Sequence, residues 1–192
     1  DVVRYCMGRP LDFDPGARFA YCNVAYLVLG RAIEAVTGVA YEEYVRRCLL
    51  APLGVTRMQL GRACLEHRAP GEVCYYDRQQ RTGPAVAPPE IGRTVPLPDG
   101  AENLEGYEAH GGWIASAIDL VRFASAFDNP AASPLLRQET IRTMFARPPG
   151  PAGHEADGRP KEAYYACGWN VRPVGAEGTF NAWHMGRIAG TS

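Results

Sequence analysis

Lysine is nearly absent from this chain of 192 residues. The only lysine is Lys161, and the residue three positions before it is Gly158, so the sequence contains no Ser-x-x-Lys pair. Arginine does not replace lysine as the base that takes a serine proton, because its guanidinium stays protonated near neutral pH. The same scarcity excludes a Gly-x-x-x-x-Gly-Lys phosphate-binding loop.

Long apolar runs are missing as well. No stretch of about eighteen apolar residues occurs, so the sequence predicts no membrane-spanning segment. The first residues do not form a signal peptide, although one could precede Asp1, and the cellular location therefore stays open. The net charge of −1 and a pI near 6.5 argue against a nucleic-acid or membrane-surface partner. An apolar content of 46% suffices for one core or for part of a larger one.

The six cysteines form no Cys-x-x-Cys pair and have no histidine partners at zinc spacing. We therefore predict no metal site and no cofactor. Cys22 and Cys48 fall inside or beside apolar helices, and we expect them to be small buried side chains rather than disulfide partners. Reduced thiols favour a cytoplasmic location.

Apolar periodicity predicts helices in the first part of the chain. Asn23 can cap the first of them, and Ser116 with Asp119 has the pattern of a capping box. The expected helices cover Val24 to Val36, Tyr41 to Leu50, a segment from Ser116 through Phe127, and Pro134 to Phe145.

Strand signals are concentrated at the end of the chain. Tyr164 to Arg172 and Thr179 to His184 have period-two patterns, and we expect a hairpin with a turn at Gly175 to Gly178. In the irregular stretch from 54 to 106, Val73 to Tyr76 is the best strand candidate, and Pro148 to Pro160 has the composition of a linker. Helices first and strands last indicate an α+β fold, divided into a mostly helical and loop region at 1–150 and a linker with strands at 151–192.

Two short motifs combine polar groups at defined places. Tyr21-Cys22-Asn23 places a hydroxyl and an amide side by side where a helix begins, and His184-Met185-Gly186 begins at the last residue of the final expected strand, directly after Trp183. Each has a purely structural alternative: Asn23 as a cap, Tyr21 as a packed aromatic, and His184 as a strand-end histidine bonded to backbone.

The surroundings of both motifs resemble one family. The run from Pro15 to Asn23 is similar to the second-motif region of the class C β-lactamase-like, penicillin-recognising serine hydrolases. Further segments resemble this family in the same order, namely His110 to Leu120, Tyr165 to Val171, and His184-Met185-Gly186 as the His-x-Gly form of its third motif. The chain is identified as a member of this family.

The resemblance implies a β-lactamase/transpeptidase-like fold, of which this chain holds the helical region and part of the antiparallel sheet. It also implies acyl-enzyme chemistry on esters, amides or β-lactam-like substrates. Tyr21 would be the general base and acid, whereas Asn23, His184, Gly186 and Trp183 would bind the substrate. The nucleophilic serine and its lysine are expected upstream of Asp1, so the chain alone should be inactive.

Three positions depart from the family pattern. His184 stands where lysine is common and Met185 where threonine or serine is common, which favours esters or small amides over carboxylate substrates. Cys22 replaces a serine, and an esterase with Cys22 as its nucleophile is a further alternative, although no His-Asp partner is visible.

A non-catalytic relative is the main competing interpretation. Such a protein would keep the cleft for binding or scaffolding and would lack Ser-x-x-Lys altogether. If the chain is instead a segment of the hydrolase fold, its sheet lacks further strands of the family and presents an exposed edge, so we expect pairing with the missing parts of the fold or with another copy of the chain.

Overall fold

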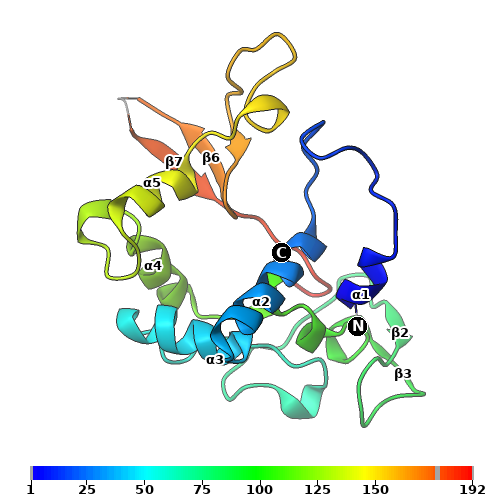
Figure 1. Cartoon of the computed structure of the whole chain (residues 1–192). Coiled ribbons are helices and arrows are strands. Elements are labelled where there is room, and N and C mark those ends of the chain that lie inside the picture. Colours follow the sequence, from blue (N-terminus) through cyan, green and yellow to red (C-terminus); the bar gives the residue numbers. More distant parts are fainter. Residues whose placement is uncertain (1, 176–177, 192) are drawn as a thin grey trace. The chain divides into compact units, whose positions relative to one another are not determined.

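The computed structural model describes residues 2–175 and 178–191. The chain forms two compact units (Figure 1): unit 1 comprises Asp1–Cys22 and Ser125–Met185, and unit 2 comprises Asn23–Ala124 and Gly186–Ser192. The chain therefore passes between units inside both predicted motifs, after Cys22 and after Met185. The division at residue 150 expected from composition stays a prediction.

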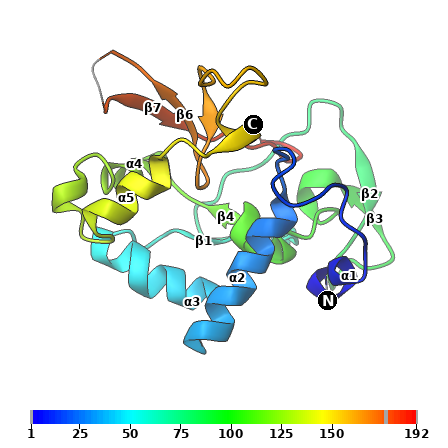
Figure 2. The ribbon, with the colours of Figure 1, turned by 45° about the horizontal axis from the view of Figure 1, so that its top comes forward.

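Unit 2 begins with two helices joined at a sharp bend (Figures 1 and 2). Helix α2 (Asn23–Thr37) ends before Gly38, whose φ of +68° suits glycine. Helix α3 (Tyr41–Val45) continues as a π-helical turn (Arg46–Leu50) and a 3-10 turn (Ala51–Leu53), and the two helical segments differ in direction by 79°. Both predicted helices are thus confirmed, the second with a change of helix type.

No single helix among residues 2–175 and 178–191 has the length and apolar content to cross a membrane. The bent pair formed by Asn23–Thr37 and Tyr41–Leu53 meets the same criterion only when both parts are taken together.

Helix α2 packs closely against the 3-10 turn Glu108–His110. A Cβ atom added to Gly30 would lie 2.9 Å from the Cβ of Ala109, so only glycine allows this approach. Arg31 forms an ion pair with Glu108 at the same contact. The close packing explains an interior glycine that would otherwise weaken a helix.

Short strands complete unit 2. Strand β1 (Gln59–Leu60) pairs antiparallel with β4 (Trp113–Ile114), and β2 (Thr82–Pro84) pairs with β3 (Thr94–Pro96), as Figure 2 shows. Carboxylates accept neighbouring backbone hydrogen bonds: Leu60 N donates to Glu42 at 3.1 Å, and Ala63 N donates to both oxygens of Glu105 at 3.1 Å.

The predicted strand Val73 to Tyr76 is wrong, because this segment is irregular. Side-chain contacts hold it instead of a strand partner. The Tyr75 hydroxyl donates to Glu72 at 2.8 Å, and the Arg68 guanidinium lies 4.8 Å from the centre of the Tyr75 ring. An alternating pattern of side chains does not by itself form a strand when the backbone has no partner strand for its hydrogen bonds.

Helix α4 (Ala117–Ser125) begins as the sequence predicts. Asp119 N donates to Ser116 Oγ at 3.1 Å, and Ser116 Oγ lies 2.9 Å from Asp119 Oδ2. The carboxylate of Asp119 is buried and also lies 3.8 Å from Arg122. The helix ends two residues before Phe127.

Unit 1 contains helix α1 (Val2–Met7) and helix α5 (Gln138–Phe145). Helix α5 is shorter than the predicted span from Pro134 because residue 137 still has extended backbone angles. Ahead of it, Leu135 N donates to Ser133 Oγ at 3.3 Å, which forms a local turn in place of a helical one.

Unit 1 also carries a three-stranded antiparallel sheet, ordered β5-β6-β7 (Figure 1). Its strands are β5 (Tyr164–Tyr165), β6 (Asn170–Pro173) and β7 (Phe180–Trp183). The prediction of one strand over Tyr164 to Arg172 is wrong, because the chain reverses where Ala166 N donates to Trp169 O at 2.7 Å and Gly168 has φ +80°. The predicted turn at Gly175 to Gly178 includes residues 176 and 177, which lie outside the described residues.

Aromatic rings form much of the core of unit 1. The Phe145 ring lies 4.9 Å from the Phe180 ring, 5.8 Å from Trp169 and 6.3 Å from Phe127, measured between centroids. The Tyr164 hydroxyl donates to Phe145 O at 3.0 Å, which fastens β5 to the end of α5.

The predicted linker from Pro148 to Pro160 is an ordered loop. It contains a 3-10 turn (Gly150–Ala152) and a bridge between His154 and Pro160. Arg147 Nη1 donates to Gly153 O at 2.9 Å and to Lys161 O at 2.7 Å, so one guanidinium closes the loop.

The remaining 3-10 turns are Leu65–His67, Leu97–Asp99, Leu104–Gly106 and Pro130–Ala132.

The expected burial of Cys22 and Cys48 is wrong, since both are exposed and only Cys64 of the six cysteines is fully buried. Cys22 precedes the first turn of α2, and Cys48 lies in the π-helical turn, where the wider spacing moves side chains off the face continued from α3. The α+β class predicted from the sequence is confirmed.

Candidate active site

Unit 1 brings Tyr21 and His184 together from opposite ends of the chain. Their ring centroids are 6.1 Å apart, and Tyr165 contacts both. The Tyr165 ring lies 5.7 Å from Tyr21 with the planes at 83°, and 5.7 Å from His184 with the planes at 72°. These edge-to-face arrangements are favourable contacts between aromatic rings.

One hydrogen bond links the polar groups of this cluster. The Tyr165 hydroxyl lies 3.0 Å from Nε2 of His184. Phe19 also contacts Tyr165, with its ring centroid 5.9 Å from that of Tyr165. We call Phe19, Tyr21, Tyr165 and His184 the aromatic cluster.

The sheet register explains why Tyr165 meets His184. Tyr165 in β5 pairs with Asn170 in β6, and Asn170 pairs with Trp183 in β7. His184 follows Trp183 directly, so it leaves the sheet beside the row that contains Tyr165. The sequence predicts Tyr165 in a strand but assigns neither Tyr165 nor Phe19 to the site, because it does not reveal the reversal at Gly168.

The other predicted site residues are placed differently. Trp183 is 36% exposed on the outer strand β7, and within residues 2–175 and 178–191 no ring contact joins it to the aromatic cluster. Asn23 is the first residue of α2, and both Asn23 and Gly186 belong to unit 2. Their roles stay predictions.

The chain's single lysine, Lys161, makes its hydrogen bond elsewhere in unit 1. Lys161 Nζ donates to Pro151 O at 2.7 Å in the loop after α5. The described part of the chain holds no group of three or more potential metal ligands. The aromatic cluster offers hydroxyl and imidazole groups, which can donate and accept hydrogen bonds and can move a proton at the phenol oxygens or the ring nitrogens.

A comparison with known families decides the relationship. The model of the family described as Beta-lactamase matches residues 1–191. The chain belongs to the Beta-lactamase family.

Individual relatives of this Beta-lactamase-family chain match smaller parts. A putative D-alanyl-D-alanine carboxypeptidase of Escherichia coli (strain K12) is 40% identical over 47 residues, which are 24% of this chain and 11% of that protein. The chain thus covers only a small share of the length of this curated relative.

Solved structures extend the likeness over the fold. A D-stereospecific amidohydrolase from Streptomyces sp. matches with a TM-score of 0.70 and 21% identity over 98% of this chain and 49% of that one. An octameric penicillin-binding protein homologue from Pyrococcus abyssi matches with a TM-score of 0.54 and 28% identity over 84% of this chain and 32% of that one. The chain corresponds to at most about half of either structure.

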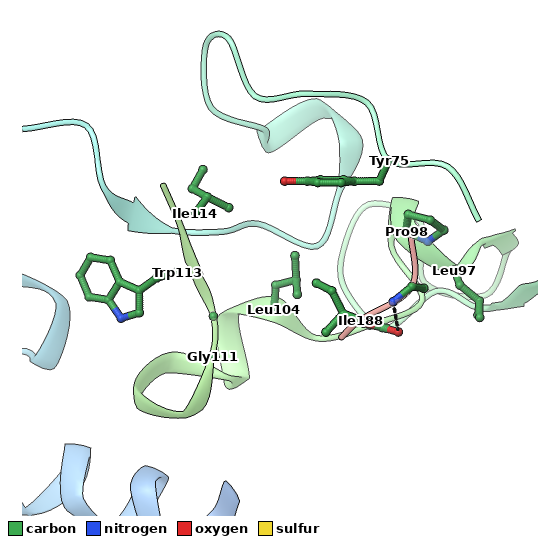
Figure 3. A pocket seen from close by; sticks show the side chains of 11 residues that line it. Tyr75, Leu97, Pro98, Leu104, Gly111, Trp113, Ile114 and Ile188 are labelled. Carbon is green, nitrogen blue, oxygen red and sulfur yellow. Dashed lines mark hydrogen bonds between the residues drawn. The ribbon is translucent and has the colours of Figure 1, made fainter. Parts of the chain in front are cut away.

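Unit 2 of this Beta-lactamase-family chain has a pocket of its own, lined mostly by apolar side chains (Figure 3). Tyr75, Leu104 and Ile188 are among the side chains around it, and Ala189 N donates to the Glu102 carboxylate at 3.3 Å. None of the residues predicted to act in catalysis or substrate binding lines this pocket.

Proposed function

We propose that this chain supplies the tyrosine and histidine groups of the active site of a serine hydrolase that acts through an acyl-enzyme. The observation that supports this most strongly is the convergence of Tyr21 and His184 within unit 1. The nucleophilic serine and its lysine would come from a segment preceding Asp1, because this sequence contains no Ser-x-x-Lys. Alone, the chain would be inactive.

The proposed reaction has two steps. The serine oxygen attacks the substrate carbonyl carbon, its proton passes to the lysine and Tyr21 pair, and Tyr21 returns a proton to the departing alcohol or amine. A water molecule then attacks the acyl-enzyme, and the same groups carry its proton to the serine oxygen. Asn23 would bind the acyl side chain, while His184, Trp183 and Gly186 would bind the rest of the substrate.

The residues of the third motif point to the substrate class. His184 offers a hydrogen-bond donor where many relatives have a lysine cation, and Met185 offers no hydroxyl. A site of this kind binds neutral acyl groups better than carboxylates. We therefore propose esters and small amides as substrates, with β-lactam-like compounds as the less suitable class.

The test is intact-mass analysis of the full reading frame after exposure to a fluorophosphonate serine probe and to a penicillin. We expect a single fluorophosphonate adduct on the full-length protein and none on residues 1–192. Tyr21→Phe should slow adduct formation by about 10²- to 10⁴-fold, the usual range for loss of an acid–base group.

Tyr76→Phe is the matched control, because Tyr76 is 81% exposed and lies outside the aromatic cluster. It should react like the wild type. The absence of any adduct on the full-length protein would overturn the proposal and would favour a relative that binds ligands without catalysis. Loss of ester hydrolysis in Cys22→Ser, with hydrolysis by Tyr21→Phe unaffected, would instead identify a cysteine esterase.

We also propose that the rest of the parent fold covers apolar side chains that this chain exposes. Leu29, Ile118 and Val121 are 56%, 66% and 64% exposed, and β7 has β6 as its one strand neighbour within the described residues. Light scattering should show residues 1–192 associating and the full-length protein as one defined species. A monodisperse monomer of residues 1–192 would contradict this.

A further inference from the structure

The geometry of the aromatic cluster points to Tyr165 as a positioning residue: we propose that its hydroxyl holds Nε2 of His184 and so leaves Nδ1–H as the donor offered to the substrate. This inference rests on the proposed function and deepens it. It assigns a role to a residue outside both short motifs.

The direction of the hydrogen bond follows from the donors and acceptors available. A neutral imidazole has one N–H and one unprotonated nitrogen, and a phenol O–H is a good donor to the latter. With the Tyr165 hydroxyl as the donor to Nε2 over 3.0 Å, which is the favoured direction because a phenol O–H is a better donor than an imidazole N–H, the ring proton of neutral His184 would lie on Nδ1. Within the described residues the His184 ring has no other hydrogen bond, so its Nδ1–H remains available to a ligand.

The surroundings of Tyr165 fix the position of its hydroxyl. Its backbone is paired with Asn170 in the sheet, and its half-buried ring contacts the rings of Phe19 and Tyr21, with centroid distances of 5.9 and 5.7 Å. A ring that is fixed at a paired strand residue and contacts two other rings loses little additional freedom when its hydroxyl makes a hydrogen bond. The hydroxyl can therefore favour one tautomer of His184, instead of reorienting to suit whichever tautomer is present.

The selected tautomer has a consequence for recognition. A neutral Nδ1–H donates one hydrogen bond without bringing a charge, and it suits a carbonyl oxygen of an ester or amide. The opposite tautomer would present an unprotonated nitrogen to that carbonyl, which would be repulsive. Tyr165 thus sets whether His184 attracts or repels the proposed substrate class.

The decisive measurement is the nitrogen spectrum of histidine ring atoms in the full-length protein, labelled with ¹⁵N-histidine, at a pH where His184 is neutral. His184→Gln identifies the signals. We expect Nδ1 to carry the proton in the wild type, and Tyr165→Phe, which keeps the ring and removes the hydroxyl, to shift the neutral ring toward the Nε2–H form.

Tyr164→Phe is the matched control, since Tyr164 is the neighbouring residue of β5 but its hydroxyl donates to Phe145 O. It should leave the His184 signals unchanged. A wild-type ring protonated on Nε2, or a Tyr165→Phe spectrum equal to that of the wild type, would overturn the inference.

Kinetics on a neutral ester provide the second measurement. Tyr165→Phe should lower kcat/KM about three- to tenfold, mostly through a higher KM, the effect expected from one hydrogen bond. An unchanged KM would also count against the role of Tyr165. If the full-length protein forms no acyl-enzyme, the proposed function fails by itself, and the nitrogen spectrum still decides whether Tyr165 sets the tautomer.

Discussion

The two units of this chain stabilise themselves in different ways. Unit 1 relies on contacts among aromatic rings, with Phe145 at the centre of a group that includes Phe180 and Trp169. Unit 2 has a mainly aliphatic core in which carboxylates accept backbone hydrogen bonds, as Glu42 and Glu105 do beside β1. Unit 1 should therefore be most sensitive to the loss of packing, and unit 2 to the loss of an acceptor.

Tyr41 and Tyr107, two tyrosines of unit 2, have a raised pKa. Burial raises the pKa of the Tyr41 phenol in unit 2, and it does the same for Tyr107. Both effects arise because a low-polarity environment disfavours the phenolate. In unit 1, the tyrosines of the aromatic cluster are instead used for ring contacts and for one hydrogen bond to His184. Tyrosines therefore contribute to packing and buried hydrogen bonds in unit 2, whereas in unit 1 they form part of the candidate site.

The largest effect should come from removing the central ring of unit 1. Phe145 is 8% exposed and touches three other rings, so Phe145→Ala should lower the free energy of unfolding by about 3–5 kcal/mol. Denaturant titration of the full-length protein measures this. Met7→Ala in the same unit, at a side chain 83% exposed, should change it by less than about 0.5 kcal/mol. Equal losses in both variants would refute the idea of an aromatic core.

Loss of the Glu105 carboxylate beside β1 should lower the free energy of unfolding by a smaller amount. Glu105→Ala leaves the N–H of the buried Ala63 without its acceptor and should cost about 1–3 kcal/mol. Glu105→Gln keeps one acceptor oxygen and should cost less. Glu66→Ala, at an exposed glutamate of the same unit, is the control. Faster hydrogen exchange at Ala63 only in Glu105→Ala would confirm the cause, and unchanged exchange there would contradict it.

The smallest effect concerns Tyr75 at high pH. Burial, the hydrogen bond to Glu72 and the charge of Glu72 raise the pKa of Tyr75 to about 12, against the opposing charge of Arg68. Because this folded-state pKa lies above the ordinary value of 10.0, the contribution of the protonated phenol is complete below about pH 10 and disappears as the pH rises toward 12.

The absorbance of phenolate isolates that titration. The difference between wild type and Tyr75→Phe at 295 nm should show one tyrosine ionising near pH 12. Tyr76→Phe, at the exposed neighbour, is the control and should leave the step near pH 12 unchanged. A wild-type minus Tyr75→Phe difference centred near pH 10 would show that the segment around Tyr75 is not held as described.

Local signals predicted much of the fold. The apolar pattern after Asn23 and the glycine at position 38 defined α2, and Ser116 with Asp119 marked the start of α4. These predictions succeeded because the groups that decide them are close in sequence. The strand at Val73 to Tyr76 failed for the opposite reason, since a strand needs a partner that its own residues do not specify.

The candidate site shows the same limit. Tyr21 and His184 were identified from their motifs, but Tyr165 was not, because its contact with His184 depends on the reversal at Gly168 and on the register of β5, β6 and β7. A single period-two pattern could not reveal that the chain turns back after Tyr165.

The sequence by itself determined the family-like motifs, the absence of Ser-x-x-Lys, the α+β class and the positions of the main helices, because residue identity and local hydrogen bonding decide these features. Only the tertiary structure decided that Tyr165 joins Tyr21 to His184 and that four cysteines are exposed. Contacts between distant segments depend on strand register and packing, which no single stretch of sequence encodes.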